Sequence, residues 1–172
     1  MLLSPGNLDI SSAVLRFAPL GHSLNYQKSE QPTPQAMKNP QTSITLTHVT
    51  LYTDETGVSQ FREDLIPLTE GSAQVTLSAL KGSGGFQLRQ SPVGFKSEFH
   101  CTDKPQFVFI LSGEMEISLQ NGQSRFFKPG DYFFSADCLP SDTLFDSRVH
   151  GHKSRQVGGE PLTTLFVRSD KE

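Results

Sequence analysis

Three histidines have the residue type and the spacing for metal binding or for acid–base chemistry. His150 and His152 are two residues apart, so on a strand their side chains lie on the same face. A divalent transition metal prefers imidazole nitrogen completed by carboxylate or water, and Asp103 or Asp142 would supply the carboxylate if its loop bends inward. The alternative is that His100, His150 and His152 are separate hydrogen-bonded or surface residues, and spacing alone favours this alternative.

Three arginines are candidates for holding an anionic substrate, because a guanidinium fork matches the geometry of a carboxylate. They are Arg89, Arg125 and Arg155. Arg155 is of most interest because it follows His152 by three residues. The alternative for each arginine is a place on the solvated face of a strand.

Composition and motifs argue against several other functions. The net charge of −3 and the lack of a basic block argue against a nucleic-acid partner, and no apolar run approaches the roughly 20 residues of a membrane-spanning helix. Cys101 and Cys138 form no CxxC pair and are expected to be reduced thiols in a cytoplasmic protein. The N-terminus is a poor secretory signal, and an organelle-targeting peptide stays an open alternative. Cys101 and His100 are adjacent and point to opposite faces of a strand, so we expect no nucleophile pair.

The elements that would position these residues are strands. Short alternating or apolar segments recur from residue 44 onward, and they are ITLTHVTLYT, AQVTLSAL, FQLRQ, QFVFILSG, EMEISLQNG, QSRFFKPGDYFF and PLTTLFVR. Met115, Ile117 and Leu119 alternate toward one face, and the following Asn-Gly predicts a hairpin turn. Strands of this length with turn residues between them predict an all-β sandwich or barrel.

The composition divides the chain into an extension and one domain. Residues 1–43 form an N-terminal extension, in which residues 25–43 are rich in Gln, Pro, Ser and Lys and are expected to be flexible. Residues 44–172 form the β domain. Residues 138–151 are too long and irregular for a tight turn, so we expect a lid near the mouth of the barrel.

One stretch of this domain resembles the first motif of the cupin superfamily (RmlC-like proteins). That motif has a glycine, two histidines, a glutamate and a second glycine at fixed spacings. Gly94, His100 and Gly113 stand at matching positions, whereas Thr102 stands at the second histidine and Gln106 at the glutamate. The frame of the motif is therefore present, and two of its three ligands are changed.

A second stretch, GQSRFFKPGD, resembles the second cupin motif with one extra residue before the proline. The histidine of that motif usually follows Pro-Gly-Asp more closely, but His152 follows Asp131 by 21 residues, so residues 138–151 look like an insertion. DETGVSQF, HCTDKPQFVFILSGEMEI and GHKSR are similar to a subgroup of small, largely uncharacterised cupins. The resemblance covers residues 46–168.

The resemblance implies a small-molecule-binding cupin β-barrel, which is a double-stranded β-helix or jelly roll, and two mechanisms fit it. In the first, iron, manganese, nickel or zinc is held by His100, Gln106 and His152 and serves an oxygenase or isomerase type of reaction. Arg155 or Arg89 then holds a substrate carboxylate. In the second, the protein is a metal-free binding module or a metal-independent isomerase that uses His100 and His152. The catalytic candidates are His100, His152 and Arg155, and a homodimer is the expected assembly.

Overall fold

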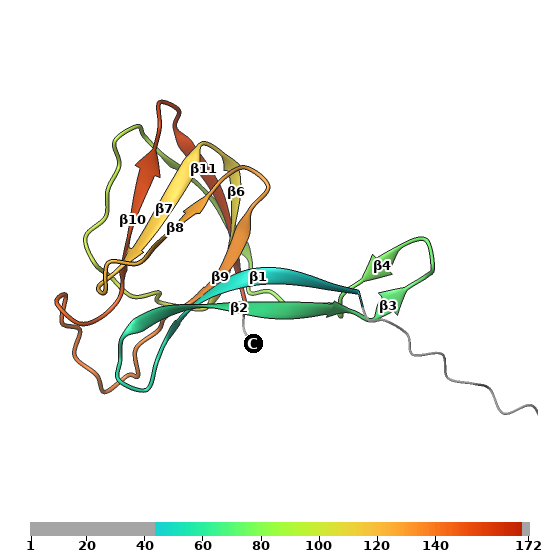
Figure 1. Ribbon diagram of the computed structural model, residues 1–172, viewed down its shortest axis with the longest axis horizontal. Coiled ribbons are helices and arrows are strands. Elements are labelled where there is room, and N and C mark those ends of the chain that lie inside the picture. The colour runs from blue at the N-terminus through green and yellow to red at the C-terminus, as the bar shows by residue number, and fades with distance from the viewer. Residues whose placement is uncertain (1–43, 170–172) are drawn as a thin grey trace, which may run out of the picture. The chain divides into compact units, whose positions relative to one another are not determined.

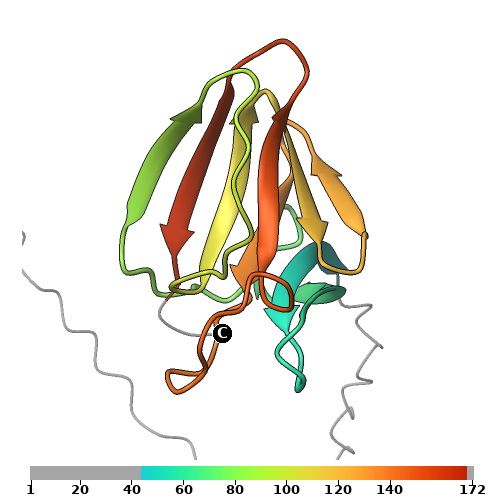
Figure 2. The same ribbon diagram turned by 90° about the vertical axis from the view of Figure 1, so that its left-hand side faces the viewer.

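A computed structural model describes residues 44–169, and this part of the chain is built of strands and loops. The predicted extension over residues 1–43 lies outside the described residues. The strands form two larger sheets and one short ribbon (Figure 1, Figure 2). The predicted all-β fold class is therefore confirmed. Within residues 44–169 there is no helix that could span a membrane.

The larger sheet has six strands. In order across the sheet they are β2 (Ser59–Leu68), β1 (Ile44–Thr53), β9 (Tyr132–Ala136), β6 (Gln106–Ser112), β11 (Leu162–Arg168) and β5 (Phe86–Ser91). β1 and β9 run parallel, and the other neighbours run antiparallel. β5 is an edge strand, because it pairs only with β11.

The smaller sheet has three antiparallel strands. In order they are β10 (His152–Val157), β7 (Glu114–Leu119) and β8 (Ser124–Phe127). β7 and β8 form the predicted hairpin, and Gly122 in its turn has a φ of 83°, which glycine adopts without strain. A further ribbon consists of β3 (Glu70–Gly71) and β4 (Thr76–Leu77).

The hydrophobic core lies between the two sheets, as in a double-sheet jelly roll. Its buried members are Leu51, Val108, Ile110, Met115, Ile117, Leu119, Phe127, Phe133 and Leu162. The larger sheet contributes residues from β1, β6, β9 and β11, and the smaller sheet contributes residues from β7 and β8. The predicted inward alternation of Met115, Ile117 and Leu119 is confirmed, since each is at most 4% exposed.

One predicted strand is largely missing. The alternating segment 73–80 forms only the two residues of β4, which pair with the equally short β3. Val75 and Leu77 are exposed instead of buried. Alternation is a local property, whereas a strand needs a partner along its whole length, and residues 73–80 do not have one.

Candidate functional site

An open pocket of about 400 Å³ lies between the two sheets beside the core. Its apolar wall contains Val108, Met115, Ile117, Phe133 and Phe166. Its polar wall contains Gln87, Arg89, His100, Thr102, Asp103, Gln106, Ser135, His152, Ser154 and Arg168. The four positions that match cupin ligand positions therefore reach one cavity, although two of them are changed in type.

A backbone bridge places His100 directly opposite His152. The amide of His100 donates to the carbonyl of His152 over 2.8 Å, the amide of His152 donates back over 2.9 Å, and the ring centroids are 4.5 Å apart. Gly151 makes this approach possible, because a Cβ there would lie 2.4 Å from the carbonyl oxygen of His100. The glycine also has a φ of 82°, which side-chain-bearing residues rarely adopt.

A buried carboxylate, Asp137, orients His152. Asp137 is fully buried. Its Oδ2 atom accepts hydrogen bonds from Nδ1 of His152 over 2.7 Å and from the Ser59 hydroxyl over 2.9 Å. Because the carboxylate is an acceptor, we assign the ring hydrogen to Nδ1, which leaves the lone pair on Nε2. His152 is therefore set up to accept a proton or to ligate through Nε2.

Thr102 donates hydrogen bonds to the other carboxylate oxygen of Asp137. Its amide and hydroxyl donate to Oδ1 over 3.2 Å and 2.6 Å. The hydroxyl oxygen of Thr102 is also 2.6 Å from the hydroxyl of Ser135. Thr102 therefore supports the carboxylate instead of facing a metal, and both oxygens of Asp137 are occupied by protein donors.

His100 has the same tautomer for a different reason. Its Nδ1 atom lies 2.9 Å from the carbonyl oxygen of Glu98, which only accepts, so Nε2 carries the lone pair. The side chain is partly open to solvent, yet the surrounding protein atoms desolvate the ring and lower its pKa below 6.5. The hydrogen bond to Glu98 and the charge of Asp137 oppose this lowering of the pKa, whereas the neighbouring His152 and the charge of Arg89 add to it. Desolvation is the largest of these causes, so the environment of His100 favours the neutral imidazole.

The donor set does not fit a firmly held metal ion. His100, Gln106 and His152 all line the pocket, but together they offer only two imidazole nitrogens and one neutral amide. Catalytic metal sites usually have three strong protein ligands, and the acidic oxygens of Asp137 are already hydrogen-bonded. Among residues 44–169 no group of three or more His, Cys, Asp or Glu side chains is placed to hold a metal.

Two arginines face the pocket. Arg89 on β5 lies with its guanidinium 4.7 Å from the ring centroid of Phe95, and partial burial lowers its pKa. Arg168, at the end of β11, donates to the carbonyl of Lys104 over 3.3 Å. The sequence reasoning missed Arg168, although the alternation of the final strand places it on the same face as the inward-facing Phe166.

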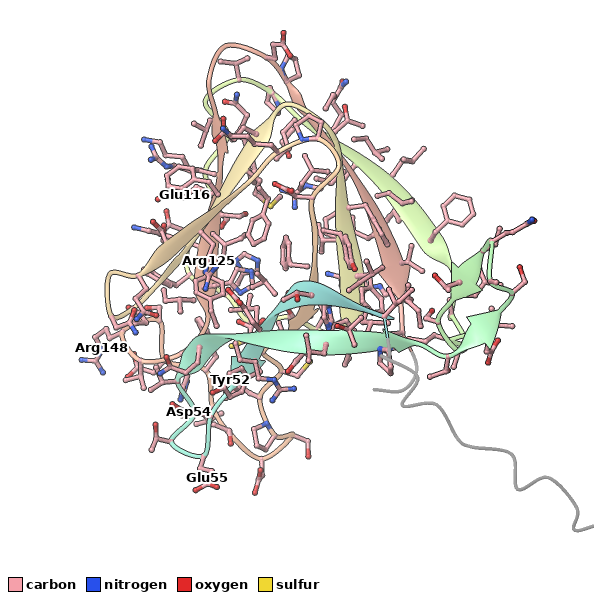
Figure 3. The ribbon with its side chains drawn as sticks, turned by 45° about the vertical axis from the view of Figure 1, so that its right-hand side comes forward. Tyr52, Asp54, Glu55, Glu116, Arg125 and Arg148 are labelled. Atoms are coloured by element: carbon pink, nitrogen blue, oxygen red, sulfur yellow. The ribbon has the colours of Figure 1, made fainter. Side chains whose placement is uncertain are left out.

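Arg155 does not join the two histidines. It lies on the opposite face of β10 from His152 and forms an ion pair with Glu116 of β7. The spacing of three residues explains this, since side chains alternate along a strand and an odd separation changes the face. Arg125 pairs with Glu63 over 3.3 Å at the surface. Figure 3 labels Glu116 and Arg125, which belong to the smaller sheet and lie outside the pocket.

The loop of residues 138–151 lies beside the site without placing His150 in it. His150 accepts a hydrogen bond at Nδ1 from the amide of Asp146 over 2.9 Å. Hydrogen bonds from Arg148 hold the pKa of Asp146 well below its usual range. The first part of the loop, Cys138–Phe145, lines a hollow of about 380 Å³ with His100, Cys101, Thr102 and Asp103. The loop therefore adjoins the histidine end of the pocket, and its role as a lid stays a prediction.

Three further candidate residues have no evident chemical role. Asp103 is exposed at the rim of the pocket, and Asp142 is exposed in the loop. Cys101 is half-buried, and burial together with the charge of Asp137 raises its pKa to about 11. Its thiol is therefore protonated at neutral pH and is a poor nucleophile.

Sequence comparison finds no matching family model and no matching curated protein. Solved structures do match. The Schizosaccharomyces pombe Cnp3 cupin domain is 16% identical, with 74% of this chain and 84% of that chain covered and a TM-score of 0.35. A Ralstonia eutropha protein assigned as a mannose-6-phosphate isomerase is 17% identical, with 73% and 85% covered and a TM-score of 0.30. A Salmonella typhimurium protein assigned as ethanolamine utilization protein Q is 14% identical, with 75% and 99% covered and a TM-score of 0.32. Because these TM-scores are low, the description of the fold rests on the strand order and the two facing sheets of this chain.

Proposed function

We propose that this chain, which has a cupin-type fold, binds a small carboxylate-bearing molecule and moves a proton on it without a metal ion. The observation that carries the proposal is the hydrogen bond from the pocket-lining His152 to the buried Asp137. A metal-independent isomerase is the reaction type that this arrangement supports best. A pocket of about 400 Å³ suits a small molecule.

His152 is the proposed acid–base group. The lone pair of its Nε2 atom takes a proton from a carbon next to the substrate's carbonyl or carboxylate group, and the C–H electron pair moves onto that group. The same nitrogen then returns the proton to another position. Asp137 holds the ring in the required tautomer and supplies a counter-charge when the ring is protonated.

The remaining pocket residues would recognise the substrate. Arg89 and Arg168 offer guanidinium groups to a carboxylate. In its neutral form, with the ring hydrogen on Nδ1, His100 accepts a hydrogen bond from a substrate hydroxyl at Nε2. The apolar wall around Val108 and Phe133 packs against the carbon skeleton.

The experiment is proton exchange at carbon. A panel of small carboxylic acids, with the matching amides as controls, is incubated with the protein in D₂O and EDTA, and loss of carbon-bound hydrogen is followed by NMR. We expect exchange for a subset of the acids and none with His152→Gln. Unchanged exchange in His152→Gln, or no exchange with any acid that binds, would contradict the proposal.

A metal-dependent oxygenase or isomerase is the second candidate, because the Nε2 atoms of both His100 and His152 are left without hydrogens. Gln106 would be the third ligand. Elemental analysis of protein purified without a polyhistidine tag separates the two candidates. Near-stoichiometric iron, manganese, nickel or zinc that is lost in His100→Ala and His152→Ala would favour the metal. Protein that takes up none of the four on addition would exclude it.

A further inference from the structure

The arginines of residues 44–169 differ in whether a carboxylate neutralises them. Each arginine outside the pocket forms an ion pair with an aspartate or a glutamate, and these pairs are Arg62 with Asp64, Arg125 with Glu63, Arg148 with Asp146 and Arg155 with Glu116. The two arginines that line the pocket are Arg89 and Arg168. Within residues 44–169 neither of them forms an ion pair with a carboxylate. The pocket therefore has the guanidinium groups that lack an anion.

The pocket itself does not supply the missing negative charge. Asp103 is the only acidic residue among the described residues that line the pocket, and it is exposed at the rim. The nearby carboxylate of Asp137 is buried and already accepts hydrogen bonds from three other residues. Partial burial lowers the pKa of Arg89, because it removes water from the guanidinium. A desolvated charge is costly without a counter-charge, so an anionic ligand would stabilise this wall of the pocket.

The strand register separates the two arginines. Arg89 is opposite Thr164 of β11, whereas Arg168 lies four residues beyond Thr164 on the same strand. A strand rises about 3.3 Å per residue, so the two backbone positions are roughly 13 Å apart along the strand. Gln87 is opposite Phe166, and this pair lies between the levels of the arginines and also lines the pocket. The two guanidinium groups therefore reach the pocket from separate positions.

Arg168 lies at the end of the pocket that contains the proposed acid–base group. Gln106 is opposite Arg168 in the sheet, and Ser135 is opposite Gln106. A chain of hydrogen bonds runs from the hydroxyl of Ser135 through Asp137 to His152. Arg168 uses Nη1 for a long hydrogen bond of 3.3 Å to a backbone carbonyl. A carboxylate at this end would receive donors from the guanidinium of Arg168 and from the amide of Gln106.

Arg89 approaches the pocket from a different level of the sheet. Its guanidinium lies 4.7 Å from the ring centroid of Phe95, and this cation–π contact positions the side chain. Desolvation and, to a smaller extent, the charge of Arg89 lower the pKa of His100, so the guanidinium also acts on the histidine pair. A ligand that contacts both arginines would therefore pass the histidines.

We infer that the ligand of this pocket is a dicarboxylic acid, with one carboxylate held by Arg89 and the other by Arg168. The inference rests on the proposed function for the choice of the pocket and of carboxylate as the anion, and it adds the second carboxylate. Two carboxylates neutralise two guanidinium charges, and each matches the fork of one arginine. Phe166 packs against the carbon chain between them. A monocarboxylate would leave one guanidinium without an anion, and inorganic phosphate would place all its charge at one end.

The test is calorimetry on the full chain in EDTA, with linear dicarboxylic acids from malonate to suberate, their half-amides and inorganic phosphate. We expect the best-fitting diacid to bind about 10- to 100-fold more tightly than its half-amide, because the half-amide loses one charged hydrogen bond. Arg89→Gln and Arg168→Gln should each remove most of this preference. The matched control is Arg125→Gln, which removes the same charge from an arginine paired with Glu63 at the surface and should keep the preference.

The comparison of diacid with half-amide uses the unmodified protein, so it does not depend on a variant that folds. Equal affinity of diacid and half-amide at every length, binding of phosphate as tight as that of the best diacid, or no binding of any diacid would overturn the inference. So would a preference that both Arg89→Gln and Arg168→Gln leave intact.

The same calorimetry on His152→Gln separates this inference from the proposed proton transfer. A diacid preference that persists in His152→Gln supports the dicarboxylate, because binding then does not need the acid–base group. If that diacid shows no exchange of carbon-bound hydrogen with the unmodified protein in D₂O, the proton transfer is wrong and the ligand class stands.

Discussion

The two faces of the larger sheet differ in polarity, although the same strands form both. On β5, Arg89 lines the pocket, while Phe86 is exposed on the opposite face. On β6, Gln106 lines the pocket, while Phe107 lies on the face turned away from the smaller sheet. The inner face thus combines the apolar core with the charged and polar residues of the pocket. The difference indicates that the inner face is suited to a polar ligand.

The largest effect is expected from removing the acceptor that organises the inner face. Asp137→Ala would remove the buried acceptor shared by His152, Thr102 and Ser59, and only the Thr102 hydroxyl would keep another partner, the hydroxyl of Ser135. We expect a loss of roughly 3–5 kcal/mol in the free energy of unfolding, measured by urea denaturation. The control is Asp103→Ala, because this carboxylate is exposed. A loss no larger than that of the control would show that the network does not hold the inner face together.

The next prediction compares two glycines to separate the cost of a steric clash from the cost of a positive φ. Gly151→Ala would place a Cβ 2.4 Å from the carbonyl oxygen of His100, whereas Gly94 has the same φ of 82° with nothing near its missing Cβ. We expect Gly94→Ala to cost about 1–2 kcal/mol of unfolding free energy from φ alone. Gly151→Ala should cost more, because it also opens the bridge between the histidines. Equal losses in thermal or urea unfolding would mean that the bridge contributes little.

Two residues of β5 allow the two faces to be compared directly. Arg89→Gln should weaken binding of a carboxylate ligand by about 10- to 100-fold through loss of a charged hydrogen bond. Phe86→Gln should leave ligand affinity unchanged, because Phe86 is exposed on the same strand and does not line the pocket. Calorimetry measures the affinity of both variants. Equal losses would mean that Arg89 makes no specific contact with the ligand.

The smallest effect concerns pH and His48, whose ring stacks against Phe107 and Tyr132. Burial lowers the pKa of His48 below 6.5, and its Nδ1 atom has no hydrogen-bond partner within residues 44–169. As the pH falls through 6.5 the unfolded chain binds the proton first, so the free energy of unfolding should decrease until the lowered pKa is reached. His48→Phe keeps a ring against Phe107 and should reduce this dependence.

His100 contributes to the pH dependence in the same direction, because its pKa is also lowered. The contribution of His48 is therefore measured twice, by comparing His48→Phe with the unmodified protein and the double variant with His100→Gln alone. The quantity measured is the urea midpoint of unfolding above and below pH 6.5. An unchanged pH slope in His48→Phe, in either background, would show that His48 does not titrate with folding.

The sequence predicted several residues of the candidate pocket and missed others for physical reasons. Motif spacing identified His100, Gln106 and His152, and the structure places all three at one pocket. The sequence already showed that Thr102 stands at the second histidine of the motif, and the structure adds that Thr102 donates to the carboxylate of Asp137. Asp137 was not identified, since its partners are separated from it by up to 78 positions in the chain.

The sequence by itself determined the local features. Alternation and turn residues decide which side chains share a face of a strand, because side-chain direction has a period of two in any extended backbone. By the same rule Arg155 is on the face opposite His152. The tertiary structure alone decided which faces meet. The pairing of β6 with β9 and β11, and of residue 100 with residue 152, brings Asp137 to His152 and forms the pocket. Such pairings depend on the register between distant segments, which no local pattern contains.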